Sequence, residues 1–150
     1  MEQSVYFREP LAFRDLGKGD INTFKLFLEQ FFTVLEDGGR MGIVVPSGIY
    51  TDQGCQALRE RFFNHGQIQF LYCFENRWPT VFTAVDGRFK FVTLSVRKSG
   101  KTDWFKCAFM EHDPERLSAI DAHALKMTVA NVKKFSPDAL SVMEFKNQRD

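Results

Sequence analysis

The feature that most constrains the fold is a short apolar run, residues 41–45, which lies between the pair Gly38-Gly39 and Pro46. A continuous apolar run of this length is typical of a strand covered on both faces, as in a parallel sheet with helices on either side. Pro46 is expected to end the strand because proline lacks the amide hydrogen that a sheet ladder needs. The polar turn after it is expected at the edge of the sheet where α/β proteins bind their ligands.

Helical patterns flank this strand. Before it, apolar residues recur at the spacing of a single helix face, and they are Phe24, Phe27, Leu28, Phe31, Phe32 and Leu35. Asp20 or Asn22 is predicted to cap the start of this helix, and Gly38 to end it in a left-handed turn. After the strand, a second helix is expected through about residue 63, with Cys55, Leu58 and Phe62 facing inward.

Two further segments, residues 68–74 and 89–96, are rich in aromatic and β-branched residues and are predicted to be strands. The loop between them, residues 75–88, is longer than most connections, and such loops in compact domains tend to be functional. Residues 104–110 are predicted to form another strand. Short helices are expected to follow, starting near Asp113 and after Thr128.

This order of elements predicts an α/β fold, namely the carboxyl-terminal part of a Rossmann-like sheet with mixed strands and flanking helices. Strand 41–45 is expected to lie antiparallel to strand 89–96 and parallel to a neighbour that the chain does not supply. Because a strand without its neighbour exposes unpaired backbone groups, we expect self-association or a rearranged amino-terminal segment to cover it. The only G-x-G sequence, residues 17–19, follows no strand pattern, which disfavours a cofactor loop there.

The composition excludes several classes of protein. Twenty basic and nineteen acidic residues give no global charge that would favour nucleic acid or membrane. No apolar run approaches the length of a membrane span, and no signal pattern starts the chain, so a cytoplasmic protein is expected. The three cysteines lack C-x-x-C spacing, and the histidines are scattered. We therefore expect buried reduced cysteines, surface histidines and no metal site.

Two stretches carry a resemblance to a known family. INTFKLFLEQFFTVLEDGGRMGIVVPSGIYTDQGCQALR, residues 21–59, and FENRWPTVFTAVDGRFKFVTLSVRKSG, residues 74–100, resemble the adenine-N6 DNA methyltransferases of restriction-modification systems. The likeness is to the large type II enzymes that fuse methylase and endonuclease. It extends over about residues 15–150. Residues 1–112 would then be the carboxyl-terminal part of a class I methyltransferase catalytic domain, and residues 113–150 a helical linker toward a target-recognition region.

The resemblance implies what the parent enzyme does. Such enzymes transfer a methyl group from S-adenosylmethionine to adenine in DNA, and the reaction needs no metal. The family's Asn-Pro-Pro-aromatic motif and glycine-rich donor loop do not occur in this sequence. The chain by itself is therefore expected to be inactive. Its expected partners are DNA and either the missing amino-terminal half or a second copy bound at the exposed sheet edge.

The resemblance also assigns two site residues. Phe82 falls at the family position whose aromatic side chain stacks on the extruded adenine, and Phe27 at a position lining the adenine pocket of the methyl donor. The plainer alternatives are that Phe27 belongs to the helix core and that Phe82 packs under its loop. Basic residues near strand 89–96 suit either DNA phosphates or a solvated edge, and they are Arg88, Lys90, Arg97, Lys98 and Lys101.

Two other functions remain open from the sequence. The chain could be a non-catalytic interaction module with a methyltransferase-like core that binds a partner subunit. It could also be a flavodoxin-like nucleotide binder, which the lack of an initial strand and phosphate loop disfavours.

Overall fold

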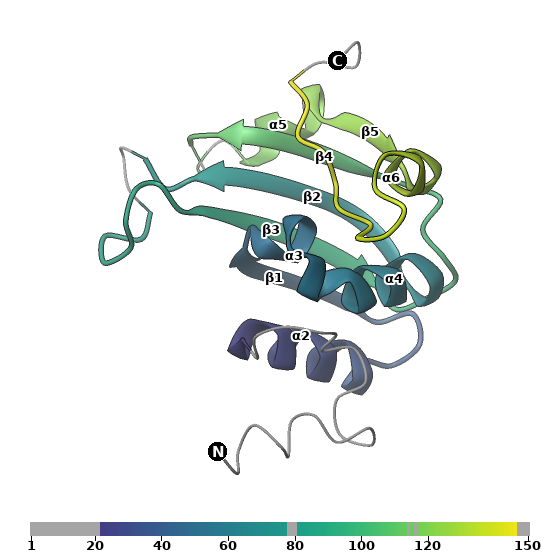
Figure 1. The fold of residues 1–150 in the computed structure, drawn as a ribbon. Coiled ribbons are helices and arrows are strands. Elements are labelled where there is room, and N and C mark those ends of the chain that lie inside the picture. Colours follow the sequence, from purple (N-terminus) through teal and green to yellow (C-terminus); the bar gives the residue numbers. More distant parts are fainter. Residues whose placement is uncertain (1–21, 78–80, 114, 116, 147–150) are drawn as a thin grey trace.

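The computed structural model describes residues 22–77, 81–113, 115 and 117–146. Within them, five strands form one sheet in the order β1-β3-β2-β4-β5 (Figure 1). The strands are β1 (Arg40–Pro46), β2 (Gln67–Glu75), β3 (Lys90–Arg97), β4 (Trp104–Glu111) and β5 (Leu125–Thr128). The helices are α2 (Thr23–Val34), α3 (Gly48–Thr51), α4 (Gln56–His65), α5 (Leu117–His123) and α6 (Val129–Phe135). The predicted α/β class with a mixed sheet is confirmed.

The sheet contains both parallel and antiparallel strand pairs. β1 lies antiparallel to β3, as the sequence predicted. In the register of this pair, Arg40 is opposite Arg97 and Pro46 is opposite Phe91. β2 is antiparallel to β3 on its other side and parallel to β4. The short strand β5, which the sequence analysis did not predict, pairs antiparallel with β4.

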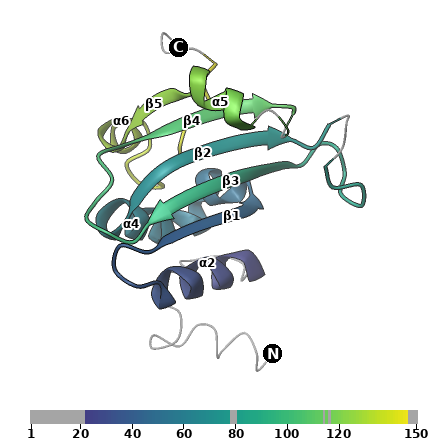
Figure 2. The ribbon, with the colours of Figure 1, turned by 180° about the vertical axis from the view of Figure 1, so that it is seen from behind.

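Helices cover the two faces of the sheet unequally. α3, α4 and α6 lie over the face seen in Figure 1, whereas α5 lies over the opposite face, seen in Figure 2. The first face carries the larger core, whose most enclosed side chains include Leu28, Phe32, Tyr50, Leu58, Phe62, Val92 and Phe105. A smaller core under α5 contains Tyr72, Phe74, Phe91, Ala108 and Ile120.

Strand β1 differs from the prediction that both its faces are covered. Met41 and Val45 are buried, but Val44 on the other face is 52% exposed and Gly42 is also exposed. The reason is that α5 covers only the β2 and β4 side of that face, where its Ile120 packs against Tyr72. Only one face of the apolar run is therefore buried.

Helix α2 also differs from the single buried stripe that was predicted. Leu28 and Phe32 are buried, and Phe32 meets Phe62 of α4 at 5.1 Å between ring centroids. Phe27 and Phe31 on the same stripe are 56% and 43% exposed. The apolar face of α2 is wider than the part that packs against α4. No described element covers the remaining part, which contains Phe27 and Phe31.

The ends of α2 partly follow the expectation. The Asn22 side chain accepts a hydrogen bond from Phe24 N at 3.3 Å and caps the start, whereas Asp20 lies outside the described residues. Gly38 has the left-handed backbone that was predicted, with φ of 83°. The helix already ends at Val34, and Gly38 belongs to the turn into β1.

Between β1 and β2, the structure breaks the one predicted helix into α3, a 3-10 turn at Gln53–Cys55 and α4. Cys55, Leu58 and Phe62 face the core as expected. The three cysteines are all buried and free, and the three histidines are all exposed, as predicted. The Thr128 side chain accepts from Asn131 N at 3.1 Å and caps α6. No described helix has the length and hydrophobicity to span a membrane.

Candidate functional site

The edge of the sheet predicted to carry the site is formed by three strand ends. β1, β2 and β4 run in one direction, so Pro46, Glu75 and Glu111 end at the same edge. β3 starts at this edge with Lys90. The long loop between β2 and β3 projects from it (Figure 1). The carboxyl edge of an α/β sheet is the usual place for a ligand.

The long loop is folded into consecutive turns. Val85 N donates to Phe82 O at 3.1 Å, and Phe89 N donates to Asp86 O at 3.0 Å. Asp86 accepts two hydrogen bonds from the Arg88 guanidinium and one from its backbone amide, and these hold the pKa of Asp86 below its usual value. Trp78 lies outside the described residues. The described part of the loop thus has a defined backbone at the sheet edge.

Phe82 lies on this loop with its ring partly open to solvent. The ring is 41% exposed and meets Phe91 edge-on, at 5.0 Å between centroids and 89° between planes. Phe91 in turn stacks on the buried Phe74 at 5.2 Å. Because Phe91 is the cross-strand partner of Pro46, the Phe82 ring stands beside the carboxyl end of β1. The ring is neither in the core nor detached from the sheet.

Phe27 lies on the outer side of α2, beside β1. It stacks on Phe31 at 5.7 Å and lines an open apolar groove of about 240 Å³. The other lining residues are Phe24, Phe31, Ile43, Val44 and Val45. Phe27 and Phe82 do not share a described neighbour. Phe27 lies beside residues 43–45 of β1, whereas Phe82 contacts Phe91 of β3. Phe27 is 56% exposed, so it is not part of the core that the described residues form.

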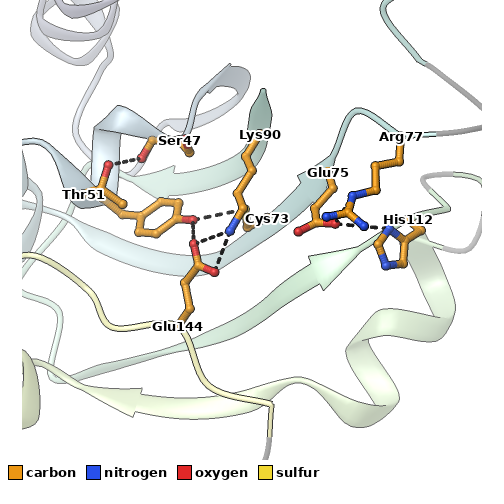
Figure 3. Close-up of polar contacts among 9 residues, drawn as sticks. Ser47, Thr51, Cys73, Glu75, Arg77, Lys90, His112 and Glu144 are labelled. Atoms are coloured by element: carbon orange, nitrogen blue, oxygen red, sulfur yellow. Dashed lines mark hydrogen bonds and ion pairs between the residues drawn. The ribbon is translucent and has the colours of Figure 1, made fainter. Parts of the chain in front are cut away.

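A cluster of polar side chains, which the sequence analysis missed, joins the carboxyl-terminal segment to this edge (Figure 3). Tyr50 donates its hydroxyl to Glu144 Oε1 at 2.6 Å, and Cys73 Sγ lies 3.2 Å from the same hydroxyl. Lys90 Nζ donates to both Glu144 oxygens, at 2.8 and 2.9 Å. These partners lie far apart in the sequence, so no local spacing could have identified them.

The charges of this cluster are matched. Burial alone would raise the pKa of Glu144, but hydrogen bonds from Lys90 and Tyr50 outweigh it and hold the pKa below its usual value. The hydrogen bond to Glu144 raises the pKa of Lys90. Burial, with the contacts to Cys73 and Glu144, raises the pKa of Tyr50. The hydroxyl therefore stays protonated and the cluster holds an ion pair.

A second polar group lies at the ends of β2 and β4. Arg77 Nε is 2.8 Å from Glu75 Oε2, and His112 Nδ1 is 3.7 Å from the same oxygen (Figure 3). Glu75 is largely covered, whereas the Arg77 and His112 side chains are more than half exposed. The Arg77 and His112 side chains are thus exposed to solvent, and the Glu75 carboxylate that they contact is shielded.

The cysteine thiols of the central strands are buried. Burial raises the pKa of the Cys73 thiol, and burial raises that of Cys107 to about 12. Ser47 accepts a hydrogen bond from the Thr51 hydroxyl through its backbone oxygen, at 3.3 Å. Among the described residues, no group of three or more His, Cys, Asp or Glu is placed to hold a metal ion.

The basic residues near β3 do not form one patch. Arg88 and Lys90 lie at the carboxyl edge, whereas Arg97 and Lys98 lie at the opposite edge, where β3 ends. Lys98 Nζ donates to Thr33 O and to the carbonyl after α2, and Arg97 Nε donates to Gly38 O. These two cations have backbone partners near the end of α2, which favours a structural role for them.

The fold matches solved structures of restriction-modification proteins. The type I restriction enzyme EcoKI M protein matches with a TM-score of 0.66 and 13% identity, covering 85% of this chain and 38% of that chain. The methyltransferase subunit of a type I system from Streptococcus thermophilus matches with a TM-score of 0.62 and 14% identity, covering 95% and 35%. The type IIG restriction endonuclease BpuSI matches with a TM-score of 0.59 and 15% identity, covering 80% and 16%.

These comparisons bear on the fold. The chain spans about a third of the two methyltransferase subunits and a smaller share of the type IIG enzyme. No protein-family model and no curated protein matches the sequence. The five-stranded sheet with its helices is thus a fold that methyltransferase subunits of restriction-modification systems contain. The sequence resemblance was to type II enzymes, and the fold is found in proteins of both types.

Proposed function

We propose that this chain is the base-facing flank of a DNA adenine-N6 methyltransferase of a restriction-modification system. The parent enzyme would transfer a methyl group from S-adenosylmethionine to adenine in DNA. An enzyme that modifies a base turns it out of the duplex and commonly holds it by stacking on an aromatic ring. Phe82 is the proposed ring in this chain.

The observation that carries this proposal is the setting of Phe82. Its ring is supported by Phe91 at 5.0 Å, and the residue is still 41% exposed, at the edge where α/β sheets bind ligands. A ring fixed by one edge and open on the rest of its surface can receive a planar base without a large loss of conformational entropy.

The residues beside Phe27 fit part of the methyl donor. The groove is lined entirely by apolar side chains, which suit the flat adenine ring of S-adenosylmethionine. We assign Phe27 to a wall of that adenine pocket. The groove lining offers no polar side chain to the ribose or the methionine part, so other residues of the parent would hold these. The donor supplies the methyl group, and the chain alone is proposed to be inactive.

Base stacking on Phe82 is tested with the chain and a single-stranded oligonucleotide that carries one 2-aminopurine in a pyrimidine run. Loss of one stacking partner costs about 1 to 3 kcal/mol. We therefore expect Phe82→Ala to weaken binding about tenfold and to remove the quenching of 2-aminopurine. Val81→Ala, a matched change at a neighbouring exposed residue, should leave both unchanged. Equal binding by wild type and Phe82→Ala would refute the stacking role.

A second test concerns the methyl donor. We expect titration calorimetry of S-adenosylmethionine against the chain to show no tight binding, because one apolar wall provides only part of a pocket. Tight binding would contradict the proposal that the chain is one flank of a larger site.

A specific observation supports a second candidate, a non-catalytic module that holds a partner subunit. β1 ends the strand order, so its outer edge pairs with no described strand, and Val44, Phe27 and Phe31 expose apolar surface beside it. Such an edge attracts another chain. The proposed occupant is the missing amino-terminal half, or a second copy of this chain.

Reconstitution separates the two candidates. The chain is mixed with a separately expressed polypeptide that carries the Asn-Pro-Pro-aromatic motif and the glycine-rich loop, and methyl transfer to DNA is measured. Restored methylation that depends on Phe82 supports the methyltransferase. A stable complex without methylation supports the interaction module.

A further inference from the structure

We propose that Asn76 is the positioning residue of the Phe82 loop, acting through the backbone of Phe82 itself. This inference rests on the proposed stacking role of Phe82 and adds the residue that sets the position of that ring. Neither a catalytic contact nor a contact with the base is assigned to Asn76.

The carboxamide of Asn76 binds both backbone groups of Phe82. Asn76 Oδ1 accepts from Phe82 N at 3.0 Å, and Asn76 Nδ2 donates to Phe82 O at 2.9 Å. The second Nδ2 proton is donated to Val85 O at 2.9 Å. One side chain thus replaces the hydrogen bonds that a strand neighbour would give, and it does so across six and nine residues of loop.

Asn76 is itself held in place. It directly follows β2, its backbone N donates to Phe89 O at 3.0 Å, and its side chain is enclosed, with the residue 1% exposed. A buried amide whose hydrogen bonds are nearly all made is rigid, because any rotation would leave polar groups unpaired. Asn76, which is anchored to the sheet, therefore holds the backbone of Phe82 in a fixed position through its side chain.

The Phe82 ring has a separate support in Phe91. Phe91 fixes one edge of the ring, and Asn76 fixes the backbone from which the ring projects. Without the carboxamide, Phe91 and the turn hydrogen bond from Val85 N to Phe82 O would remain, but no group of the sheet would hold the Phe82 backbone. The amide is the group that decides where the open part of the ring points.

The test compares two substitutions at Asn76 with a matched control. Asn76→Ala removes all three hydrogen bonds, and Asn76→Asp keeps the shape but places oxygen against the carbonyls of Phe82 and Val85. The control is Thr102→Val, since Thr102 is also buried and its hydroxyl accepts from Ile68 N and shares its proton between Gly66 O and Phe62 O. Circular dichroism and melting temperature establish that each variant folds.

The first readout is binding of the 2-aminopurine oligonucleotide described above. We expect both Asn76 variants to weaken binding about five- to tenfold, as Phe82→Ala does, and Thr102→Val to stay within about twofold of wild type at a similar loss of melting temperature. If Phe82→Ala weakens binding and the Asn76 variants do not, the positioning role is refuted while the proposed function stands.

The second readout does not depend on base binding. In a Phe82→Trp chain labelled with 5-fluorotryptophan, the fluorine resonance absent from the unsubstituted chain reports position 82. We expect one narrow resonance with Asn76 and a broadened or shifted one with Asn76→Ala, but no change with Thr102→Val. An unchanged resonance with Asn76→Ala overturns the inference about Asn76. This outcome can be read whether or not Phe82 stacks on a base.

Discussion

Lys90 and Glu144 lie 54 residues apart in the sequence, yet Lys90 Nζ is 2.8 and 2.9 Å from the two carboxylate oxygens of Glu144. The pair fastens the carboxyl-terminal segment to the start of β3, at the edge that carries Phe82. Val142 N, which donates to Tyr50 O at 2.9 Å, adds a backbone link beside it. The end of the described chain is therefore part of the site's framework.

The ion pair predicts a pH window. The pKa of Glu144 lies below its ordinary 4.5, so its contribution is complete above that pH and is lost as pH falls through the folded value. The pKa of Lys90 lies above its ordinary 10.5, so its contribution is complete below that pH and is lost as pH rises through the folded value. The pair should stabilise the fold between about pH 5 and pH 10.

Glu144→Gln tests this window by urea unfolding across pH. We expect a loss of about 1 kcal/mol near neutral pH, because both side chains are only partly exposed, and a smaller difference in acid. Lys106→Gln, in the more exposed pair Lys106–Asp121, should cost less than about 0.5 kcal/mol. A wild-type advantage that grows toward acid pH would contradict the assignment.

Arg59 predicts a larger effect. It is 3% exposed, and its guanidinium donates to Ile49 O, Asp52 O and Ala139 O at 2.8, 2.7 and 2.6 Å. Arg59→Met would remove all three hydrogen bonds, although Asp52 O would still accept from Cys55 N at 3.0 Å, and we expect the free energy of unfolding to fall by about 2 to 3 kcal/mol. Arg88→Met, at a side chain that is 89% exposed, should leave the free energy of unfolding nearly unchanged.

The groove beside β1 predicts association. Sedimentation of the chain should show a rising coefficient with concentration, and Val44→Lys should abolish the rise, because a charge on an edge strand disfavours pairing. Val34→Lys is the control, since Val34 is 67% exposed on α2 but does not line the groove. A wild-type chain that stays monomeric throughout would count against self-association and leave the missing half as the proposed occupant.

Gly38 predicts a local backbone effect. Its φ of 83° favours glycine, and a Cβ there would meet only Arg97 at 3.7 Å, so the cost of Gly38→Ala is conformational. We expect thermal or urea unfolding to show a loss of about 1 kcal/mol. Gly42→Ala, where a Cβ would meet nothing within 4 Å and φ is not left-handed, should not destabilise. Equal effects at both positions would contradict this reason.

Local patterns predicted much of the fold and the position of one candidate site residue. The strands at β1, β2, β3 and β4 and the start of α6 follow from hydrophobic pattern and capping, which act over a few residues. The position of Phe82 on the loop between β2 and β3 also follows from the sequence, since strands on both sides confine that loop to the sheet edge, whereas the sequence left open whether the side chain packs under the loop. Its role in stacking and the boundary near residue 112 stay predictions.

The sequence by itself determined most of the helices and strands, though not β5 or the break between α3 and α4, because the choice of helix or strand depends on the periodicity of neighbouring residues. Only the tertiary structure decided which apolar side chains are buried, as the exposed Phe27 and Val44 demonstrate, since burial requires a second element to pack against. It also decided that Asn76 binds the backbone of Phe82 and that Glu144 reaches Lys90. Such contacts arise when distant segments return to one sheet edge, and no local spacing encodes that return.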